Sequence, residues 1–566
     1  MKVVTTVRAA AIAAAALLLT ACAGLPTSGP VGIVGLPSDD AESDAPFTEV
    51  ASGPTAGAGP EEIVAGFLEA SITPSESWSI ARQFLSPELA ETWRPSAGVS
   101  IDAAGSPRTY ASSIEDVEAS SAGSVVVELD QRASVDESGQ YTEAVGDTEL
   151  VFQVERDADG EWRITSAPDG IVLDEVSFQQ VYDSYALQYF DRTWTHLVSD
   201  VRWYPRRSTI ATTITQAVVE GQASEWLAPA VQSAFPADVL LDGNSVPVTA
   251  QVADVALTEV ALSLDTTTLA RMRTQLEHSL SSAGVTEVRF TVDGRELEAG
   301  TVTLANGGTE TSTLVLTEDG FGSLIGGEVS SVAGVSAELE QIEQPIVAID
   351  VAQDAGLAAV QLDSGAVYAV SEGRVDELDA RADLVRPSID PYGYIWTVPS
   401  SDPQAVTAWS ADVASHDIAD AWPEASAISA LRVSADGVRI AALVTMGGHQ
   451  SVVTAVILRD DDGMPTGLGP VRELAELSTP ATGLSWLGTD SLGILVTGED
   501  AEMITQVVGG PGETQAAPSG SVSIAGATTT GGVRVLGADG VLFTPRVSAW
   551  QEYFQGALVL GTRAGY

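Results

Sequence analysis

The sequence is poor in cysteine and histidine. Its 566 residues include one cysteine, Cys22, and four histidines. A single cysteine excludes a disulfide within the chain, so the stability must come from packing. The histidines are too far apart in sequence for a pair of metal ligands on one helix. We therefore expect neither a metal site nor a cofactor. The four histidines are His196, His278, His416 and His449.

Positive charge is also scarce. There are 26 Lys and Arg residues against 78 Asp and Glu residues, which gives a formal net charge of −52. Because a protein binds nucleic acid by neutralising its phosphates with Lys and Arg, this composition excludes nucleic acid as a partner. The acidity is spread along the chain and is typical of a solubilising surface. Hydrophobic residues make up 45% of the chain, enough for well-packed cores.

Long apolar runs are absent apart from one short run at the start. Lys2 and Arg8 precede the apolar residues 9–19, in the manner of a secretory signal. The run is too short to cross a membrane. Leu-Thr-Ala at residues 19–21, followed directly by Cys22, resembles the bacterial lipobox. The resemblance implies cleavage between Ala21 and Cys22 and acylation of the Cys22 thiol, as in palmitate-modified lipoproteins. The alternative is an ordinary signal peptide with a chance cysteine.

Residues 1–21 form the predicted signal peptide, and the chain that follows divides into four parts. The first part, residues 22–60, is rich in Pro, Gly, Ala and Ser and forms a predicted flexible tether. The lipid on Cys22 holds this tether to the membrane, while the acidic body is repelled by anionic headgroups. Helical spacing over 61–68 and strand patterns over 124–129 and 148–154 predict an α+β domain. We assign it to residues 61–175 and expect a curved, NTF2-like sheet.

Residues 176–315 show a second α+β pattern. Strands are predicted over 197–205, 250–257, 260–265 and 285–292. Helices are predicted over 210–219 and 269–280, the latter with Met272, Leu276 and Leu280 on one face. Asp293-Gly294 predicts a hairpin turn.

Helical patterns vanish in residues 316–566. Short strands there alternate with turns that contain Asp354, Asp390, Asp436 and Asp490, at an irregular spacing. Repeated strand–turn–strand units of this kind are typical of a β-propeller, here of five to seven blades. The alternative is a pair of β-sandwiches.

Several stretches resemble the LpqB family of actinobacterial lipoproteins. They are the start of the mature chain at 22–29, the segment 161–173, the stretches 218–221 and 226–231, and the segment 288–294. The resemblance implies an N-terminal LpqB domain, a GerMN module and a C-terminal propeller. It therefore agrees with the predicted fold class, two α+β modules (one NTF2-like, one GerMN) followed by an all-β propeller.

The family resemblance also implies a role. Members are expected on the extracytoplasmic face of the cell membrane, where they contact the ectodomain of the MtrB-like sensor histidine kinase of a two-component system. Through this contact they modulate cell-wall homeostasis and division. The expected activity is binding, and we do not expect an enzyme. The alternative is a lipoprotein whose propeller binds or hydrolyses cell-wall glycan, so a cell-wall component is the other expected partner.

Two short motifs are candidates for a phosphate loop and a Ca²⁺ loop. The glycine-rich stretch 320–326 lacks both the spacing and the nearby basic residue of a phosphate loop, so we interpret it as a turn between domains. The acidic run 460–463 lacks the alternating ligands of a Ca²⁺ loop and is interpreted as a solvated hairpin tip. A glycan hydrolase would instead need two facing carboxylates with raised pKa values in the propeller's funnel.

Candidate partner contacts come from the second module. Large aromatic residues there form either an exposed binding patch or part of the core. Two arginines that stand out in so acidic a chain either meet an acidic partner or form a salt-bridged loop. These candidates are Trp203, Tyr204, Trp226 and Phe235, with Arg206 and Arg207.

Overall fold

The computed structural model describes residues 52–72, 78–305, 312–460, 462–498, 500–546 and 549–565. The predicted signal peptide, Ala21, Cys22 and most of the predicted tether lie outside these residues. The chain from Ala51 onward forms one compact unit. Among the described residues, no helix combines the length and the apolar character that a membrane crossing requires.

The N-terminal domain packs short helices against one mixed sheet with the strand order β5-β4-β3-β1-β6, to which β2 adds by pairing with β3. Strands β1 and β6 are parallel, and the other pairs are antiparallel. The long strands β3 and β4 contain the strands predicted over 124–129 and 148–154. The elements are α2 (Pro60–Ala70), η2 (Ala81–Phe84), α3 (Pro87–Thr92), η3 (Pro95–Ala97), β1 (Gly98–Asp102), β2 (Thr109–Ser112), β3 (Ala122–Asp136), β4 (Tyr141–Arg156), β5 (Trp162–Ser166), β6 (Ile171–Asp174) and α4 (Glu175–Val181).

Helix α2 forms where the sequence predicts a helix. Proline occupies its first turn, and the Glu62 carboxylate accepts a hydrogen bond from the Gly59 backbone N–H at 2.9 Å. This bond satisfies a backbone donor that the helix start leaves unpaired. The apolar face then buries Phe67, whose ring lies 5.1 Å from that of Trp93 and 6.0 Å from that of Phe152. Helix and sheet thus share one core.

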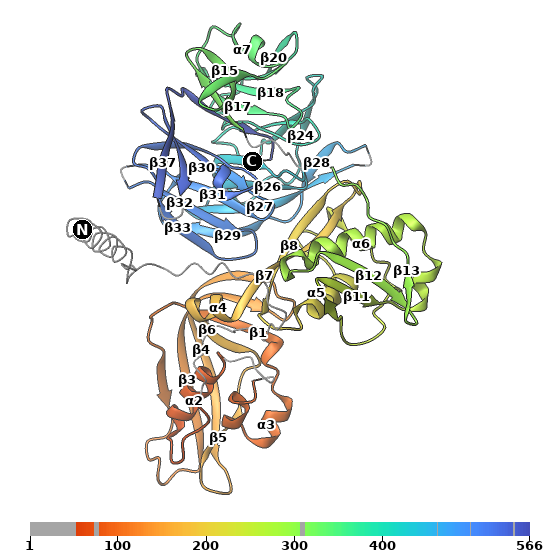
Figure 1. Ribbon diagram of the computed structural model, residues 1–566. Coiled ribbons are helices and arrows are strands. Elements are labelled where there is room, and N and C mark those ends of the chain that lie inside the picture. The colour runs from red at the N-terminus through yellow and green to blue at the C-terminus, as the bar shows by residue number, and fades with distance from the viewer. Residues whose placement is uncertain are drawn as a thin grey trace, which may run out of the picture. The chain divides into compact units, whose positions relative to one another are not determined.

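The middle domain contains two small sheets, β10-β11-β12-β13 and β8-β7-β9, with the helices α5 and α6. Figure 1 shows β7 and β8 as a long hairpin, drawn in yellow, beside α5. The elements are β7 (Tyr182–Asp191), β8 (Leu197–Pro205), α5 (Ile210–Val219), β9 (Val231–Gln232), β10 (Val248–Thr249), β11 (Val252–Ala256), η4 (Glu259–Ser263), α6 (Thr266–Leu280), η5 (Ser281–Ala283), β12 (Glu287–Val292) and β13 (Arg295–Leu297).

Helix α6 confirms the predicted buried face. Asp265 caps its start by accepting hydrogen bonds from the Thr267 and Thr268 backbone N–H groups at 2.8 and 2.9 Å. Met272, Leu276 and Leu280 on the predicted face are buried completely. The predicted hairpin turn at 293–294 also forms, and it joins β12 to β13.

The strand predicted over 260–265 is wrong. Residues Glu259–Ser263 form the short 3-10 helix η4, and Leu262 is 62% exposed. A five-residue alternation of apolar residues fits a strand or one helical turn equally well. The turn is favoured here because Asp265, two residues later, already caps α6.

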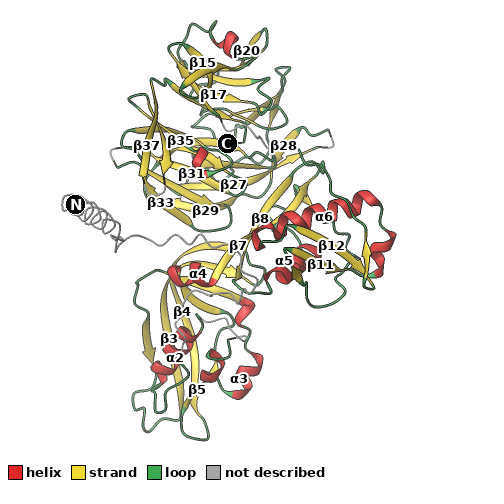
Figure 2. Cartoon of the chain, in the orientation of Figure 1, coloured by secondary structure: helices red, strands yellow, loops and turns green. Residues whose placement is uncertain are grey.

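The C-terminal domain is a propeller, and within its described residues six blades surround a centre. The innermost strands are β17, β21, β25, β30, β34 and β38, and each contacts the next around the ring. Strands dominate this domain, while the longer helices of Figure 2 lie in the first two domains. The number of blades falls within the predicted range of five to seven.

The ring is closed by its two ends. The C-terminal strand β38 (Val559–Arg563) pairs antiparallel with β14 (Thr313–Thr317), so the first blade combines the start and the end of the domain. Its outer strands are β15 (Gly320–Ile325) and β16 (Glu328–Ser331), followed by α7 (Ser336–Leu339). The pairing with β38 covers the inner edge of β14, which would otherwise be unpaired.

The other five blades follow in chain order. Their strands are β17 (Ile346–Val351), β18 (Ala358–Leu362), β19 (Val367–Ser371), β20 (Arg374–Asp379); β21 (Ser388–Ile389), β22 (Ile395–Thr397), β23 (Thr407–Trp409), β24 (Ser415–Asp417); β25 (Ala427–Val433), β26 (Arg439–Met446), β27 (His449–Arg459), β28 (Pro465–Leu468), β29 (Arg472–Leu477); β30 (Ala481–Leu487), β31 (Ser491–Val496), β32 (Glu502–Val507), β33 (Gly512–Ala516); and β34 (Ser521–Ala525), η6 (Thr530–Gly532), β35 (Arg534–Gly537), β36 (Val541–Arg546), β37 (Ala549–Gln555).

The interpretation of 320–326 as a turn between domains is wrong, because this stretch is mostly strand β15. Gly322 in this stretch allows close strand packing. A Cβ on Gly322 would lie only 2.2 Å from the backbone oxygen of Ser330 on β16. Glycine is the residue that allows backbones to approach this closely.

The aspartate-rich turns share one mechanism. Asp390 Oδ1 accepts hydrogen bonds from the backbone N–H groups of Tyr392 and Tyr394, at 3.0 and 2.9 Å. Asp460 does the same with the N–H groups of residues 462 and 464, at 3.0 and 2.9 Å. The Asp460 carboxylate thus holds a hairpin turn, which confirms the hairpin interpretation of this acidic run.

Candidate functional site: the junction of the three domains

Strand β8 contacts all three domains. The backbone N–H of Trp203 donates to the oxygen of Gly139, at the β3–β4 turn of the N-terminal domain, at 2.8 Å. Its indole N–H donates to the oxygen of Gly509 in the propeller at 2.9 Å. The Trp203 ring is 8% exposed and lies 5.0 Å from that of Phe178. One side chain therefore links the three domains.

Tyr204 extends the contact with the N-terminal domain. Its ring is buried, and its hydroxyl donates to the backbone oxygen of Ser138 at 3.0 Å. Arg202, on the same strand, donates to that oxygen at 3.0 Å as well. Gly139 has φ +84°, and a Cβ there would lie 2.9 Å from the Tyr204 ring. Only glycine combines that backbone angle with this contact.

The two candidate arginines directly follow β8, and their side chains have different partners. Arg206 is half exposed, lies 3.4 Å from Asp183 and donates to the backbone oxygens of Tyr182 and Gln179. Arg207 lies over the ring of Trp78, 4.7 Å from its centroid. Burial lowers the pKa of Arg207. Both side chains thus have partners within the chain, and Arg206 forms a salt bridge of the kind that the loop alternative expects.

Trp226 and Phe235 are buried as well, at 9% and 7% exposure. Phe235 packs edge-on against Phe290 in the core of the middle domain. Trp226 lies under the guanidinium of Arg472 from the propeller, 5.6 Å away. All four aromatic candidates therefore pack inside this chain, and a contact of any of them with a partner stays a prediction.

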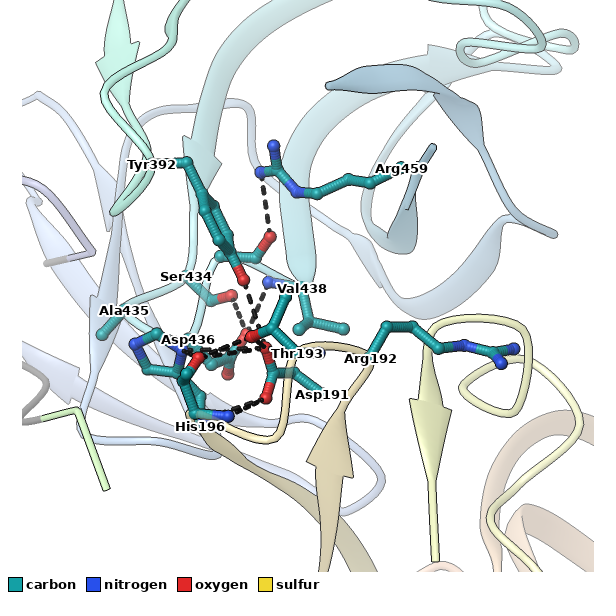
Figure 3. A network of polar contacts seen from close by, with 12 residues as sticks. Asp191, Arg192, Thr193, His196, Tyr392, Ser434, Ala435, Asp436, Val438 and Arg459 are labelled. Carbon is teal, nitrogen blue, oxygen red and sulfur yellow. Dashed lines mark hydrogen bonds and ion pairs between the residues drawn. The ribbon is translucent and has the colours of Figure 1, made fainter. Parts of the chain in front are cut away.

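The tip of the β7–β8 hairpin carries a second set of contacts with the propeller (Figure 3). Asp191 is 1% exposed and accepts hydrogen bonds from the backbone N–H groups of Thr195 and His196, both at 2.8 Å. The hydroxyl of Tyr392, from the propeller, lies 3.3 Å from the Asp191 carboxylate. The hairpin turn and the propeller loop thus share one buried carboxylate.

Burial would raise the pKa of Asp191, but hydrogen bonds from His196, Thr193 and Thr195 outweigh it and hold the pKa below its usual value. Burial also raises the pKa of Tyr392 to about 12, with the Asp191 carboxylate adding to the effect. Tyr392 is therefore a hydrogen-bond donor to an ionised carboxylate at neutral pH. Arg459 stacks on the Tyr392 ring at 4.2 Å and pairs with Asp390 at 2.6 Å.

A buried ion pair lies beside this network. Arg439, at 1% exposure, pairs with Asp436 and donates to the backbone oxygens of Ser199 on β8 and Thr489 in the next blade. On the middle-domain side, Arg202 pairs with Asp200 at 2.7 Å, and both side chains are buried. Both arginines therefore have a carboxylate partner at the junction.

A cleft of about 990 Å³ opens where the three domains meet. The lining includes Glu143 from β4, Trp226 from the middle domain, and Arg472 and Glu473 from β29. Arg472 donates to the backbone oxygen of Tyr141 at 2.6 Å, so β29 is attached to β4. Burial lowers the pKa of Arg472.

Of the five acidic residues that line this cleft, Glu143 and Glu473 interact. Glu143 is open to the water of the cleft, but protein surrounds it on several sides. This partial burial, with the charge of Glu473 added, raises the pKa of Glu143 to about 7. The group can therefore hold or release a proton near neutral pH. Within the described residues, no group of three or more His, Cys, Asp or Glu side chains is placed to hold a metal ion.

Sequence reasoning selected β8 but missed its partners. Asp191, Glu143 and Arg472 had no local signal beyond their residue types. Gly509 lies 306 residues after Trp203, so no pattern in a short window could connect them. Asp436 and Arg439 are three residues apart, and this spacing is the one signal that was available.

Comparison with known families covers most of the chain. The model described as Lipoprotein LpqB, N-terminal domain, matches residues 53–179, and the Lipoprotein LpqB beta-propeller domain matches residues 319–558. Between them, residues 185–298 match the Germane model, described as sporulation and spore germination. The chain belongs to the LpqB lipoprotein family. None of the three matched families is named for an enzymatic activity.

Curated relatives agree with this assignment. Lipoprotein LpqB of Streptomyces coelicolor is 26% identical over 87% of this chain and 86% of its own length. Lipoprotein LpqB of Nocardia farcinica is 26% identical over 88% and 87%. Lipoprotein LpqB of Thermobifida fusca is 31% identical over 51% of this chain, and this match spans 47% of that relative. The LpqB resemblance and the Germane module are thus confirmed.

Among solved structures, TolB from Acinetobacter baumannii matches 44% of this chain and 64% of its own at 14% identity. The TM-score is 0.32, which is too low to support an argument.

Proposed function

We propose that this LpqB-family lipoprotein is anchored by Cys22 on the extracytoplasmic face of the cell membrane. There it binds the ectodomain of an MtrB-like sensor kinase and modulates its signalling in cell-wall homeostasis and division. The lipoprotein family and the motif at residues 19–22 support the anchor. The binding role itself rests on the family resemblance.

One observation favours binding over glycan hydrolysis. A hydrolase in the propeller would need two facing carboxylates in the central funnel. The cavity in the propeller centre is instead lined by two arginines, Arg386 and Arg432. Among the described residues that line it, Asp383 is the one carboxylate, so this cavity does not supply the required pair.

The junction determines how the partner can be bound. Because β8 ties the three domains together, the kinase ectodomain meets them as one body. Removing the propeller at residue 315 would uncover Trp203 and Ser199, so a truncation would report loss of the junction. Single substitutions of exposed apolar residues, one in each domain, locate the partner surface better.

The test is titration calorimetry of residues 51–566 against the purified kinase ectodomain. We expect micromolar or tighter binding. Three variants then map the contact, and each replaces a side chain that is 47%, 62% or 59% exposed, so that the fold is left intact: Val151→Ser, Leu262→Ser and Leu558→Ser. The domain whose variant weakens binding makes the contact, and the other two variants serve as controls. Absence of binding by the folded protein would refute direct contact.

The second candidate is a glycan ligand in the junction cleft. Glu143, with its pKa near 7, beside Glu473 has the residue types of an acid–base pair. Release of reducing ends from purified cell-wall polymer, abolished by Glu143→Gln, would support hydrolysis. Binding of the polymer without release would support a glycan-binding role.

A further inference from the structure

The propeller contains a cavity of about 480 Å³ at one end of its centre. The first residues of the inner strands β25, β30 and β34 line it, together with the segment 383–386. The same strands β25 and β30 lead, at their other ends, to Asp436 and Thr489 in the loops that face the middle domain. The cavity therefore lies at the end of the propeller away from β8.

Two arginines converge on this cavity. Arg386 is exposed where it lines the cavity, and its guanidinium has no hydrogen bond or ion pair with any described residue. Arg432 is 7% exposed. It donates to the backbone oxygens of Pro387 and Leu431 at 2.8 and 3.2 Å, while its Nε–H is buried without a partner. Neither forms a salt bridge with a described carboxylate.

Two carboxylates lie near these arginines. Asp383 also lines the cavity, but within the described residues it forms no salt bridge with either arginine. Asp350 is buried and its charge acts on Arg432, while its carboxylate accepts hydrogen bonds from the Ile389 backbone N–H at 2.7 Å and the Thr562 hydroxyl at 2.8 Å. Burial and the neighbouring Arg432 lower the pKa of Arg386 to about 10, so it is still charged at neutral pH. Two positive charges and one negative charge thus line one cavity, in a chain whose net charge is −52.

Burial of Arg432 favours an anion beside it, because a buried charged group needs partners for its donors and the Nε–H of Arg432 has none. A guanidinium recognises carboxylate and phosphate groups through paired N–H donors. The rest of the lining suits an organic body attached to that group. Apolar walls come from Leu384, Leu431 and Leu484, and hydroxyl groups come from Ser400 and Thr482. The volume falls in the range of small-molecule sites.

We propose that this cavity binds a small organic anion, held through a carboxylate or phosphate group by Arg386 and Arg432. Arg386 supplies a free guanidinium fork, and the unpartnered Nε–H of Arg432 supplies a further donor. This inference does not rest on the proposed kinase contact.

The test is titration calorimetry of residues 51–566 with inorganic phosphate and, separately, with D-glucuronate, at an ionic strength held constant with sodium chloride. Saturable one-site binding of either probe is expected, and the tighter probe identifies the group. Arg386→Gln should weaken binding about tenfold or more, since a charged hydrogen-bonding partner is lost. Arg386 forms no contact whose loss would unfold the chain.

The matched control is Arg374→Gln. It removes the same charge from β20, an outer strand, where Arg374 pairs with Asp376 and is half exposed. This variant should bind like the unaltered protein. If neither probe binds, or if the two variants weaken binding equally, the site does not exist. The kinase titration is independent, so either proposal can fail alone.

Discussion

Arg432 and Arg439 lie on the same hairpin, β25–β26, and are both buried, yet their guanidinium groups have different partners. Arg439 pairs with Asp436 and bonds two backbone oxygens across the domain junction. Arg432 donates to backbone oxygens only, has an unpartnered Nε–H, and lies near both the Asp350 carboxylate and a second arginine. The arginine with a salt bridge holds domains together. The arginine without one is available for a ligand.

The largest expected effect comes from unpairing Arg439. Asp436→Ala would leave that arginine buried beside the junction without its carboxylate. Breaking a buried pair in this way costs about 3–5 kcal/mol, which a lowered urea midpoint would report. In the control Asp376→Ala the lost partner is the exposed Arg374, and the cost should be about 0–1 kcal/mol. Equal losses would mean that burial does not distinguish the two pairs.

Loss of a neutral hydrogen bond at the junction should lower the stability less than loss of the ion pair. Trp203→Phe keeps most of the buried ring but removes the indole N–H that donates to Gly509. Loss of one hydrogen bond should cost about 1 kcal/mol. Trp550→Phe removes a comparable bond, 2.8 Å to the oxygen of Ala516, at an exposed position. Denaturation should therefore show a smaller loss for Trp550→Phe, and the reverse order would contradict the role given to Trp203.

The smallest effect concerns a carboxyl group at the junction that has no positive partner. The pKa of Glu143 is raised to about 7 in the folded chain, above the usual glutamate value of about 4.3. Between these two values the folded state holds the proton more tightly, so stability falls as pH rises from about 4.5 to 7.

Glu143→Gln should therefore be more stable than the unaltered protein at pH 8 and equal to it at pH 4. The gain should be at most about 1 kcal/mol, because the group is open to solvent. Urea midpoints measured across this pH range would show it. Glu149→Gln, on the same strand, is the control for the loss of one negative charge. A gain that is independent of pH would contradict the assignment to Glu143.

The sequence predicted the elements that local chemistry determines. The caps and apolar faces of α2 and α6 could be located, and so could the strand β8 and the turns held by aspartates. Prediction failed at 260–265 and 320–326, where short apolar or glycine-rich stretches fit more than one structure. In both places the outcome depends on neighbours, Asp265 in one and β16 in the other.

The candidate sites were harder to predict for a related reason. Trp203 and Arg472 acquire their roles from residues hundreds of positions away. Arg386 lies in the segment between β20 and β21, Arg432 lies in β25, and neither has a distinctive sequence context. Only the closed ring brings them to one cavity, and only there does the lack of a salt bridge become visible.

The comparison of paired and unpaired arginines is tested most directly by one pair of variants in one buffer free of multivalent anions. The urea unfolding midpoints of Asp436→Ala and Arg386→Gln are measured beside that of the unaltered protein. The account predicts opposite results: a clear loss for Asp436→Ala, and an equal or higher midpoint for Arg386→Gln, because that change relieves repulsion with Arg432. A loss of stability in Arg386→Gln as large as that in Asp436→Ala would show that Arg386 supports the fold, and would contradict the account.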